Sequence, residues 1–252
     1  MPAARIEKYG PEVQKVPADA PLEDILYLLK RDGGVFVKNL VSEEDVDKAC
    51  EDVKERLDAD VEWEGAFFPT MRIGPGGKAQ PLHRDDYISH NHHTEIDEWD
   101  DERDRNRETA VGLFVAGSRV TKENGGTQFI PRSHLWGTDR DTPPRVDQCI
   151  FADMEKGDAF IMLASAYHGG GDNVTKDQRR MLFSTFVVRG YLRQEENQFL
   201  AVPKDVVKGY DRPIQEFIGY SMSEPACGYL EQLDPIYALN PELLKGTAPK
   251  DF

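Results

Sequence analysis

The apolar positions near the N-terminus follow helical spacing. Residues 20–34, APLEDILYLLKRDGG, place apolar side chains three to four positions apart and end in a glycine pair, which predicts a short helix. VFVKNL at 35–40 then predicts a strand. Residues 42–57, SEEDVDKACEDVKERL, open on Ser42 with Asp45 three positions later. This capping pattern, followed by an apolar stripe, predicts a second helix.

From Phe67 onward the pattern changes from helical to strand-like spacing. Short apolar runs alternate with turns rich in Gly, Pro and Asn, as in TAVGLFVAGSRV, GDAFIMLAS and MLFSTFVVRGY. Such spacing is typical of a many-stranded sandwich or barrel. Residues 90–108, HNHHTEIDEWDDERDRNRE, are almost wholly polar without a period, and we expect a solvated loop there. The tail returns to helical and loop segments from Pro203.

Composition narrows the class of protein further. Of the 252 residues, 39% are hydrophobic and 31% charged, which is ordinary for a globular protein with a real core. The formal net charge of −15 argues against a general affinity for nucleic acid or an anionic membrane. Three scattered cysteines indicate neither a disulfide framework nor a zinc knuckle, and no apolar leader or spanning run is present. We therefore expect one cytoplasmic domain over residues 1–252.

The first chemical signal is the pair His83 and Asp85 in LHRDD. If this stretch is a strand, alternate residues share one face, so the imidazole and the carboxylate point together. The pair supplies two of the three ligands in the 2-His-1-carboxylate set that binds non-haem Fe(II). By itself, an H-x-D pair also fits a surface strand.

A third element lies in GDAFIMLASAYHGGGDN, where a predicted strand runs into His168. His168 follows His83 by 85 residues and can return to the same end of a sandwich. Arg179 and Arg180 follow at the start of the next strand, where an arginine can hold a carboxylate through two hydrogen bonds. Because strand residues alternate between faces, only one of the two arginines can point inward.

Three stretches, GPGGKAQPLHRDD, ENGGTQFIPRSHLWG and AYHGGGDN followed by the arginine pair, resemble the phytanoyl-CoA dioxygenase-like family. These are Fe(II)/2-oxoglutarate-dependent oxygenases, and the chain is most similar to their fungal secondary-metabolism branch. The resemblance implies a double-stranded β-helix (jelly-roll) core at about 67–192. A helical part at about 20–58 and a helix-and-loop tail at 193–252 would flank it.

The resemblance also implies roles for individual residues. His83, Asp85 and His168 match the iron ligands and would be the catalytic centre. The positions that match the family's contacts to 2-oxoglutarate are Gln80, Thr127 and Arg179, with Arg180 as the alternative to Arg179. Gln80 can face His83 only if Pro81 breaks the strand register.

The same resemblance implies oxidative decarboxylation of 2-oxoglutarate by O2, coupled to attack on a C–H bond of an apolar natural product such as a meroterpenoid or alkaloid. Halogenases of this class lack the carboxylate ligand, so the presence of Asp85 disfavours halogenation. Hydroxylation, desaturation, epoxidation and rearrangement all stay open.

One departure from the family pattern leaves alternatives open. Only 25 residues separate Leu57 from His83, where relatives carry a longer stretch. A pocket wall is therefore either missing or supplied by another chain, in a homodimer or in a heterodimer with a related oxygenase. The first alternative is a metal-binding but non-catalytic partner subunit of a full-length enzyme. The second is a cupin-like metal enzyme, such as an isomerase, that uses no keto acid.

Several other side chains have two readings. The apolar side chains before His83 could line an apolar pocket or pack in the core; they are Trp63, Phe67, Phe68 and Met71. Tyr87 could reach a substrate or lie on the surface, and we expect His134 to bond backbone groups in a turn.

Overall fold

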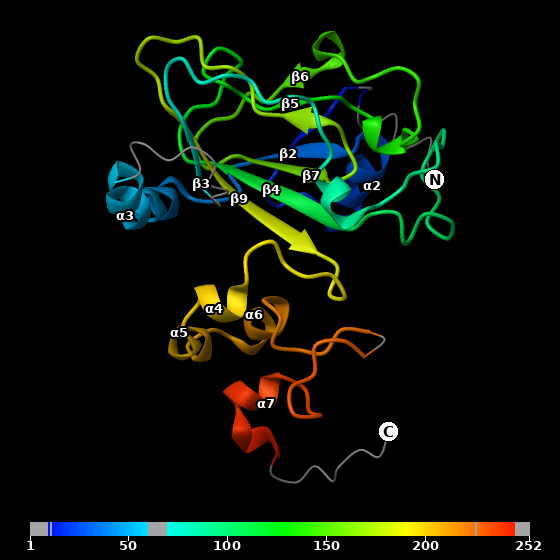
Figure 1. Ribbon diagram of the computed structural model, residues 1–252. Helices are drawn as coiled ribbons and strands as arrows, with labels where there is room; N and C mark the ends of the chain where they lie inside the picture. Colours follow the sequence, from blue (N-terminus) through cyan, green and yellow to red (C-terminus); the bar gives the residue numbers. More distant parts are fainter. Residues whose placement is uncertain (1–9, 11, 60–69, 225, 245–252) are drawn as a thin grey trace. The chain divides into compact units, whose positions relative to one another are not determined.

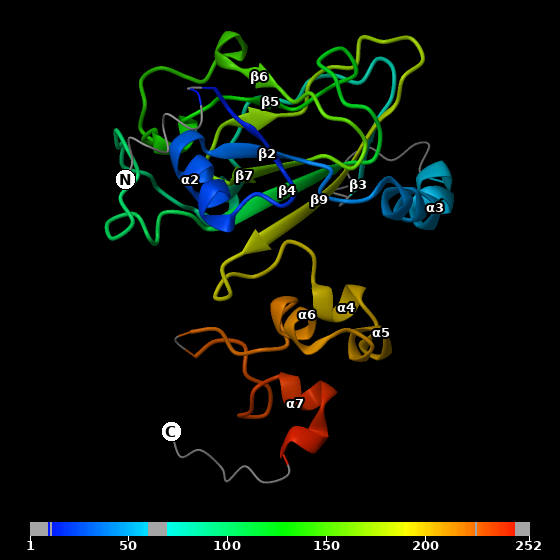
Figure 2. The same ribbon diagram turned by 180° about the vertical axis from the view of Figure 1, so that it is seen from behind.

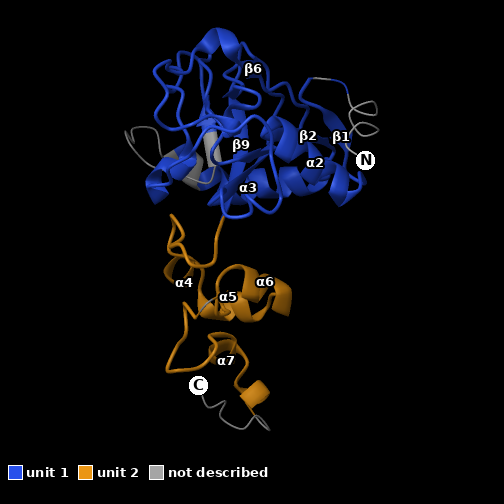
Figure 3. Cartoon of the chain, turned by 90° about the vertical axis from the view of Figure 1, so that its right-hand side faces the viewer, with its two compact units in different colours: residues 1–187 blue, residues 188–252 orange. Residues whose placement is uncertain are grey.

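The computed structural model describes residues 10, 12–59, 70–224 and 226–244. The chain divides into two compact units, Met1–Val187 and Val188–Phe252 (Figure 3). Each unit is described by itself below. Trp63, Phe67 and Phe68, for which the sequence offered a pocket-lining role, lie outside the described residues, and Met71 is described only through its backbone.

The main element of the first unit is a six-stranded sheet. β1 (Lys15–Pro17) pairs parallel with β2 (Gly34–Lys38), whereas β7 pairs antiparallel with both β2 and β4, and β3 with β9. The sheet order is β1, β2, β7 (Ala159–Leu163), β4 (Ala110–Ala116), β9 (Arg180–Val188) and β3 (Thr70–Ile73). The strands predicted around 35–40, 109–120, 157–165 and 181–191 are therefore present.

A second, three-stranded sheet lies against the first, and Figure 1 shows β5 and β6 as a layer apart from β2, β7 and β4. Its antiparallel order is β6 (Ile150–Phe151), β5 (Gln128–Phe129) and β8 (His168–Gly169). Phe129 from this sheet meets Phe160 of β7 edge to face, with ring centroids 5.1 Å apart. Because both rings are buried, the core lies between the two sheets, as in a sandwich.

The opposite face of the large sheet is covered by α2 (Leu22–Asp32), which Figure 2 shows lying over β2. Leu28 and Leu29 of this helix pack against Val35 and Val37 of β2 in a second apolar cluster. Strand alternation therefore sends Phe36 to one face and its neighbours to the other, and both faces are buried. The helix ends at Gly33, as the glycine pair predicted.

The second predicted helix is α3 (Glu43–Ala59). The Oγ of Ser42 accepts a hydrogen bond from the backbone N of Asp45 at 3.1 Å and donates to the Asp45 carboxylate at 2.7 Å. These two bonds form the cap that the sequence predicted. Val46, on the apolar face of α3, is fully buried.

Short helical turns connect the strands of the first unit. They are η1 (Asp85–Ser89), η2 (Ser133–Leu135) and η3 (Val146–Gln148). The predicted strand at LHRDD is wrong, because Asp85 begins η1 and His83 belongs to an isolated bridge rather than a strand.

The second unit is made of short helices around a small core. Its apolar cluster among the described residues contains the buried side chains of Val207, Tyr220, Ile236 and Leu239. The helices are α4 (Gln198–Ala201), α5 (Lys204–Lys208), α6 (Arg212–Phe217), α7 (Ile236–Leu239) and η4 (Pro241–Leu244). These short helices lie between Gln198 and Leu244. Within the described ranges, no helix combines the length and the apolar character needed to cross a bilayer.

Candidate metal centre and co-substrate pocket

His83, Asp85 and His168 are brought together by a backbone bridge between two distant segments. The N–H of His83 donates to the carbonyl of His168 at 2.8 Å, and the N–H of His168 returns a bond to the carbonyl of His83 at 2.9 Å. The N–H of Asp85 donates to the carbonyl of Ala164 at 3.0 Å, which fixes the start of η1 beside the end of β7. The H-x-D pair therefore converges on one side without the strand alternation that the sequence suggested.

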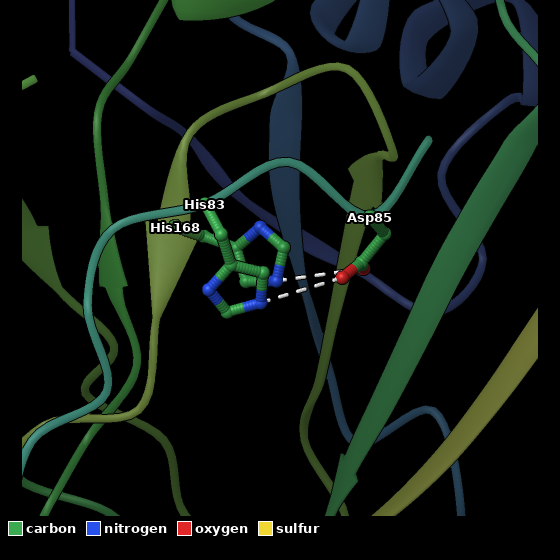
Figure 4. Close-up of side chains that lie close together, drawn as sticks. All are labelled: His83, Asp85 and His168. Carbon is green, nitrogen blue, oxygen red and sulfur yellow. Dashed lines mark ion pairs between the residues drawn. The ribbon is translucent and has the colours of Figure 1, made fainter. Parts of the chain in front are cut away.

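The three side chains offer one donor atom each within 4.8 Å of one another (Figure 4). Nε2 of His83 lies 3.5 Å from Oδ1 of Asp85, and Nε2 of His168 lies 3.4 Å from Oδ2. The group therefore has the composition and spacing of a 2-His-1-carboxylate site.

Both imidazole rings are fixed in the same tautomer by their own backbone. Nδ1 of His83 lies 2.8 Å from the carbonyl oxygen of Pro81, and Nδ1 of His168 lies 3.1 Å from that of Ala166. Because a carbonyl oxygen can only accept, each Nδ1 carries the proton of the neutral ring. Each Nε2 is then left with a lone pair directed at the shared site, as metal binding requires.

The burial of these groups favours a cation among them. Oδ2 of Asp85 is buried and has no hydrogen-bond donor in the described part of the chain. Such an oxygen is costly to leave without a positive partner. Burial lowers the pKa of His168, which keeps that ring neutral, whereas the hydrogen bond to Asp85 raises the pKa of His83. The residues present therefore fit a divalent metal ion.

The site is open on one side. The side chain of His168 is 7% exposed and that of Asp85 14%, but that of His83 is 41% exposed. Tyr87 and Ile88, which lie in η1 two and three residues after the candidate ligand Asp85, are also exposed. A substrate can therefore approach from the side of His83, and Tyr87 is on the surface.

A second set of polar groups gathers at Gly170, two residues after His168. The Oε1 of Gln80 accepts a hydrogen bond from the N–H of Gly170 at 2.7 Å. A Cβ added at Gly170 would lie 3.1 Å from that oxygen and 3.7 Å from Nη2 of Arg180. The glycine thus leaves a space between an amide and a guanidinium group.

Arg180 is the residue that points into this space. Arg180 is 1% exposed, and its three guanidinium nitrogens are buried with no hydrogen-bond partner among the described residues. Burial lowers the pKa of Arg180 to about 10, so the group stays charged at neutral pH. A buried, unpaired arginine calls for an anionic partner, and a carboxylate matches its geometry.

The structure turns Arg180, rather than the predicted Arg179, towards Gly170. Arg179 is exposed to solvent immediately before β9, whereas Arg180, the first residue of that strand, is turned into the protein. The sequence limited the choice to one of two residues, but only the register of β9 against β3, with Ile73 opposite Arg180, decides between them.

Thr127 directly precedes β5. In the pairing of β5 with β8, Phe129 lies opposite His168 and Gln128 opposite Gly169. Continuing this register by one residue would put Thr127 opposite Gly170. Thr127 is 5% exposed, so its side chain is buried beside this strand.

A surface hollow of about 570 Å³ is lined in part by Gln128 of β5. The Nε2 of Gln128 donates to the carbonyl of Gly170 at 3.1 Å, but the lining includes none of the three candidate ligands. The hollow is therefore distinct from the candidate metal centre.

The histidine-rich loop differs from its expected description. Residues 90–108 contain no helix or strand, yet His93 is 2% exposed and its Nε2 lies 2.5 Å from the carboxylate of Asp86. His90 and His92 are exposed, as expected of a solvated loop. The loop is therefore partly folded into the protein, and the pairing of His93 with Asp86 was not evident from a polar stretch without a period.

His134 has the structural role that the sequence suggested. It is fully buried, and its Nε2 donates to the carbonyl of Lys30 in the last turn of α2 at 3.0 Å. Burial lowers the pKa of His134 to about 4, so the ring is neutral.

The model of one protein family, phytanoyl-CoA dioxygenase, matches residues 32–181. Dioxygenase swnH1 of Arthroderma benhamiae is 33% identical over 290 aligned positions, which cover 90% of this chain and 92% of the relative. Dioxygenase himG of Aspergillus japonicus is 32% identical over 293 positions, covering 89% of each chain. A crystal structure of the non-heme alpha ketoglutarate dependent carbocyclase SnoK from nogalamycin biosynthesis superimposes with a TM-score of 0.49 at 14% identity, covering 71% of this chain and 86% of that one.

The alignment lengths bear on the shortened segment noted above. Because 290 aligned positions exceed the 252 residues of this chain, the Arthroderma relative carries internal residues that this chain lacks.

Proposed function

Because the chain belongs to the phytanoyl-CoA dioxygenase family, we propose that it is an Fe(II)- and 2-oxoglutarate-dependent oxygenase acting on an apolar natural product. The observation that carries the proposal is the pair of Nε2 lone pairs held against a buried, unpartnered Asp85 oxygen. His83, Asp85 and His168 would hold the iron, leaving open positions for the co-substrate and O2. Bound iron supplies O2 activation coupled to oxidative decarboxylation.

The protein's own residues bind and orient 2-oxoglutarate in this proposal. Arg180, in place of Arg179, pairs with the distal carboxylate, and the Thr127 hydroxyl donates to the same group. The amide of Gln80, held by Gly170, lines the side of the space nearest the ligands. Burial of Arg180 keeps water away from the pair, which strengthens the attraction. The two facing sheets would form the jelly-roll core.

The substrate class and the outcome of oxidation rest on the similarity to fungal dioxygenases. An apolar scaffold suits the exposed Tyr87 and Ile88 beside the open side of the centre. The presence of Asp85 as a ligand leaves no coordination position for a halide, so hydroxylation, desaturation or rearrangement is the proposed class of reaction.

A second function is favoured by one observation, the internal residues that the relative has and this chain lacks. The chain could bind metal and co-substrate as the partner subunit of a longer, related oxygenase that completes the pocket. In this alternative the isolated chain binds the metal ion but does not turn over substrate by itself.

The test is an anaerobic titration of the purified chain with Fe(II) and then 2-oxoglutarate. A weak absorption band at about 500 nm, where an Fe(II)–keto-acid chelate absorbs, should appear only after both additions and be lost in His168→Ala. Arg180→Met should weaken 2-oxoglutarate binding at least about tenfold, because a bidentate ion pair is lost. Arg179→Met is the matched control and should leave the affinity unchanged.

The outcomes separate the readings. No band in the wild-type chain would overturn the proposed function, and an affinity loss in Arg179→Met alone would return the role to that residue. A normal band without succinate formation, restored by a longer related oxygenase, would support the partner-subunit alternative.

A further inference from the structure

Arg84 lies in sequence between two of the candidate ligands and is itself buried. Arg84 is 8% exposed, and its Nη2 donates hydrogen bonds to the carbonyls of Ser133 at 3.0 Å and Trp136 at 2.9 Å. Its guanidinium carbon lies 4.4 Å from the centroid of the Tyr167 ring. Arg84 therefore connects the segment of His83 and Asp85 to the residue that directly precedes His168.

Tyr167 is held in the same place by an independent bond. Its backbone N–H donates to the Oγ of Ser133 at 2.7 Å, and that hydroxyl donates in turn to the carbonyl of Ile130 at 2.7 Å. Ser133 is fully buried. Arg84, Tyr167 and Ser133 thus form a closed set of three contacts beside the metal centre.

Burial removes water from the charged guanidinium group of Arg84, and this desolvation costs free energy that an apolar residue would not lose. Electrostatic attraction from Asp86 offsets part of that cost, and the Tyr167 ring stacked against the guanidinium offsets a further part. Asp86 follows the candidate ligand Asp85, and Tyr167 directly precedes His168. The compensating interactions therefore come from the two segments that carry the candidate ligands.

We propose that Arg84 and Tyr167 are positioning residues that fix the distance between the His83–Asp85 segment and His168. The pair acts through the backbone and touches neither metal nor substrate. This inference rests on the proposed metal centre, because its consequence is metal affinity. A cation stacked on a ring suits the task, since a planar guanidinium can stack and donate to two carbonyls at once.

The test compares variants of the full-length chain by anaerobic titration with Co(II), a spectroscopic substitute for Fe(II). Arg84→Met and Tyr167→Leu should each weaken Co(II) binding by about 10- to 100-fold, the usual effect of losing an outer contact to a metal site. Tyr167→Phe keeps the ring and should restore affinity to within about threefold of wild type. Circular dichroism at the titration temperature establishes that each variant is folded.

Arg31 offers a matched control. Its guanidinium carbon lies 5.8 Å from the ring centroid of Tyr27, also in α2, and its side chain is 12% exposed, so it makes the same kind of contact away from the candidate ligand segments. Arg31→Met should therefore lower stability without changing Co(II) affinity. Equal affinity losses in Arg31→Met and Arg84→Met would overturn the proposal, because the effect would then be one of general destabilisation.

A double-mutant cycle gives a readout that does not depend on metal. In urea unfolding of the metal-free chain, Arg84→Met combined with Tyr167→Leu should cost less than the sum of the single changes, because both remove one interaction. Additive costs, or wild-type Co(II) affinity in folded Arg84→Met, would overturn the pair as a positioning device. If the wild-type chain bound no Co(II), the proposed metal centre would fail, and coupling in the cycle would still decide whether the contact holds the two segments.

Discussion

Glu108 is a buried carboxyl group held against the segment that leads to His168. Its Oε1 accepts a hydrogen bond from the Oγ of Ser165 at 2.5 Å. Burial raises the pKa of Glu108 from 4.5 to about 7, with a further contribution from the nearby charge of Asp86, while the bonds from Ser165 oppose the shift. The folded chain therefore holds a proton on Glu108 at a pH where the unfolded chain has released it.

The pH dependence of stability follows from this shift. Because the pKa is raised in the folded state, the contribution is present in full below pH 4.5 and is lost as the pH rises to about 7. Between pH 5 and 8 the wild type should lose about 2 kcal/mol relative to Glu108→Gln, which cannot ionise. Urea unfolding of both metal-free proteins at several pH values measures the difference.

The stability of the wild type must be compared with that of Glu108→Gln, because the titration of His134 changes stability with pH in the opposite direction. The pKa of His134 is lowered to about 4, so its contribution is lost as the pH falls from its ordinary value of 6.5. The exposed Glu98 lies in the same loop, and Glu98→Gln is the control that should follow the wild-type profile. Parallel profiles for wild type and Glu108→Gln would contradict the prediction.

Single residues also show where the sequence was informative and where it was not. His83, Asp85 and His168 could be proposed as ligands from residue type, spacing and the family resemblance, because metal-ligand chemistry restricts the residue types, and the structure brings the three side chains together. The choice between Arg179 and Arg180 could not be made, since a shift of one residue in strand register exchanges the faces. The burial of His93 depends on Asp86 and on long-range packing, which a local polar pattern does not report.

At the scale of elements, helix α2 ends on a residue that must adopt a left-handed conformation. Gly33 has φ of 81°, and its N–H donates to the carbonyl of Leu29 at 2.8 Å. A Cβ at this position would lie 2.5 Å from Nδ1 of His134. The end of the helix is therefore packed directly on the turn η2, which also carries Ser133.

Gly33→Ala should destabilise the chain through two separate effects. The left-handed backbone costs about 1–2 kcal/mol for a residue with a Cβ, and the contact with His134 adds about 1–3 kcal/mol of overpacking. Gly76 provides the control, because its φ is 82° and a Cβ there would meet nothing within 4 Å. Gly76→Ala should therefore lower the free energy of unfolding in urea by the backbone cost alone. Equal losses of stability at both positions would show that the His134 side chain moves away from the added Cβ without cost.

The elements themselves were predictable where a strong periodic pattern coincided with a cap or a turn. Helices α2 and α3 and strands β2, β4, β7 and β9 follow this rule. The predicted strand at LHRDD was wrong because Pro81 removes a backbone donor, and Asp85 then turns into η1. The candidate ligands converge all the same, since the backbone bridge between His83 and His168 replaces the missing strand.

At the scale of the whole molecule, every residue assigned to the centre lies in the first unit. The candidate ligands, Gln80, Thr127 and Arg180 all precede Val187, and the two larger apolar clusters belong to that unit as well. In the described part of the second unit, the apolar cluster is smaller and contains four buried residues. Whether the two units unfold as the single domain that we expect is open to calorimetry, where one transition would support it.

A chain ending at residue 190 should therefore fold and bind Co(II) with an affinity within about threefold of the full-length chain, because the truncation removes no ligand and no contact of Arg84 or Tyr167. The cut preserves β9, which ends at Val188, and with it the strand that presents Arg180. Circular dichroism and the same anaerobic titration make the measurement. A folded truncated chain with much weaker Co(II) binding would show that the second unit contributes to the centre, and the assignment of the whole site to the first unit would be wrong.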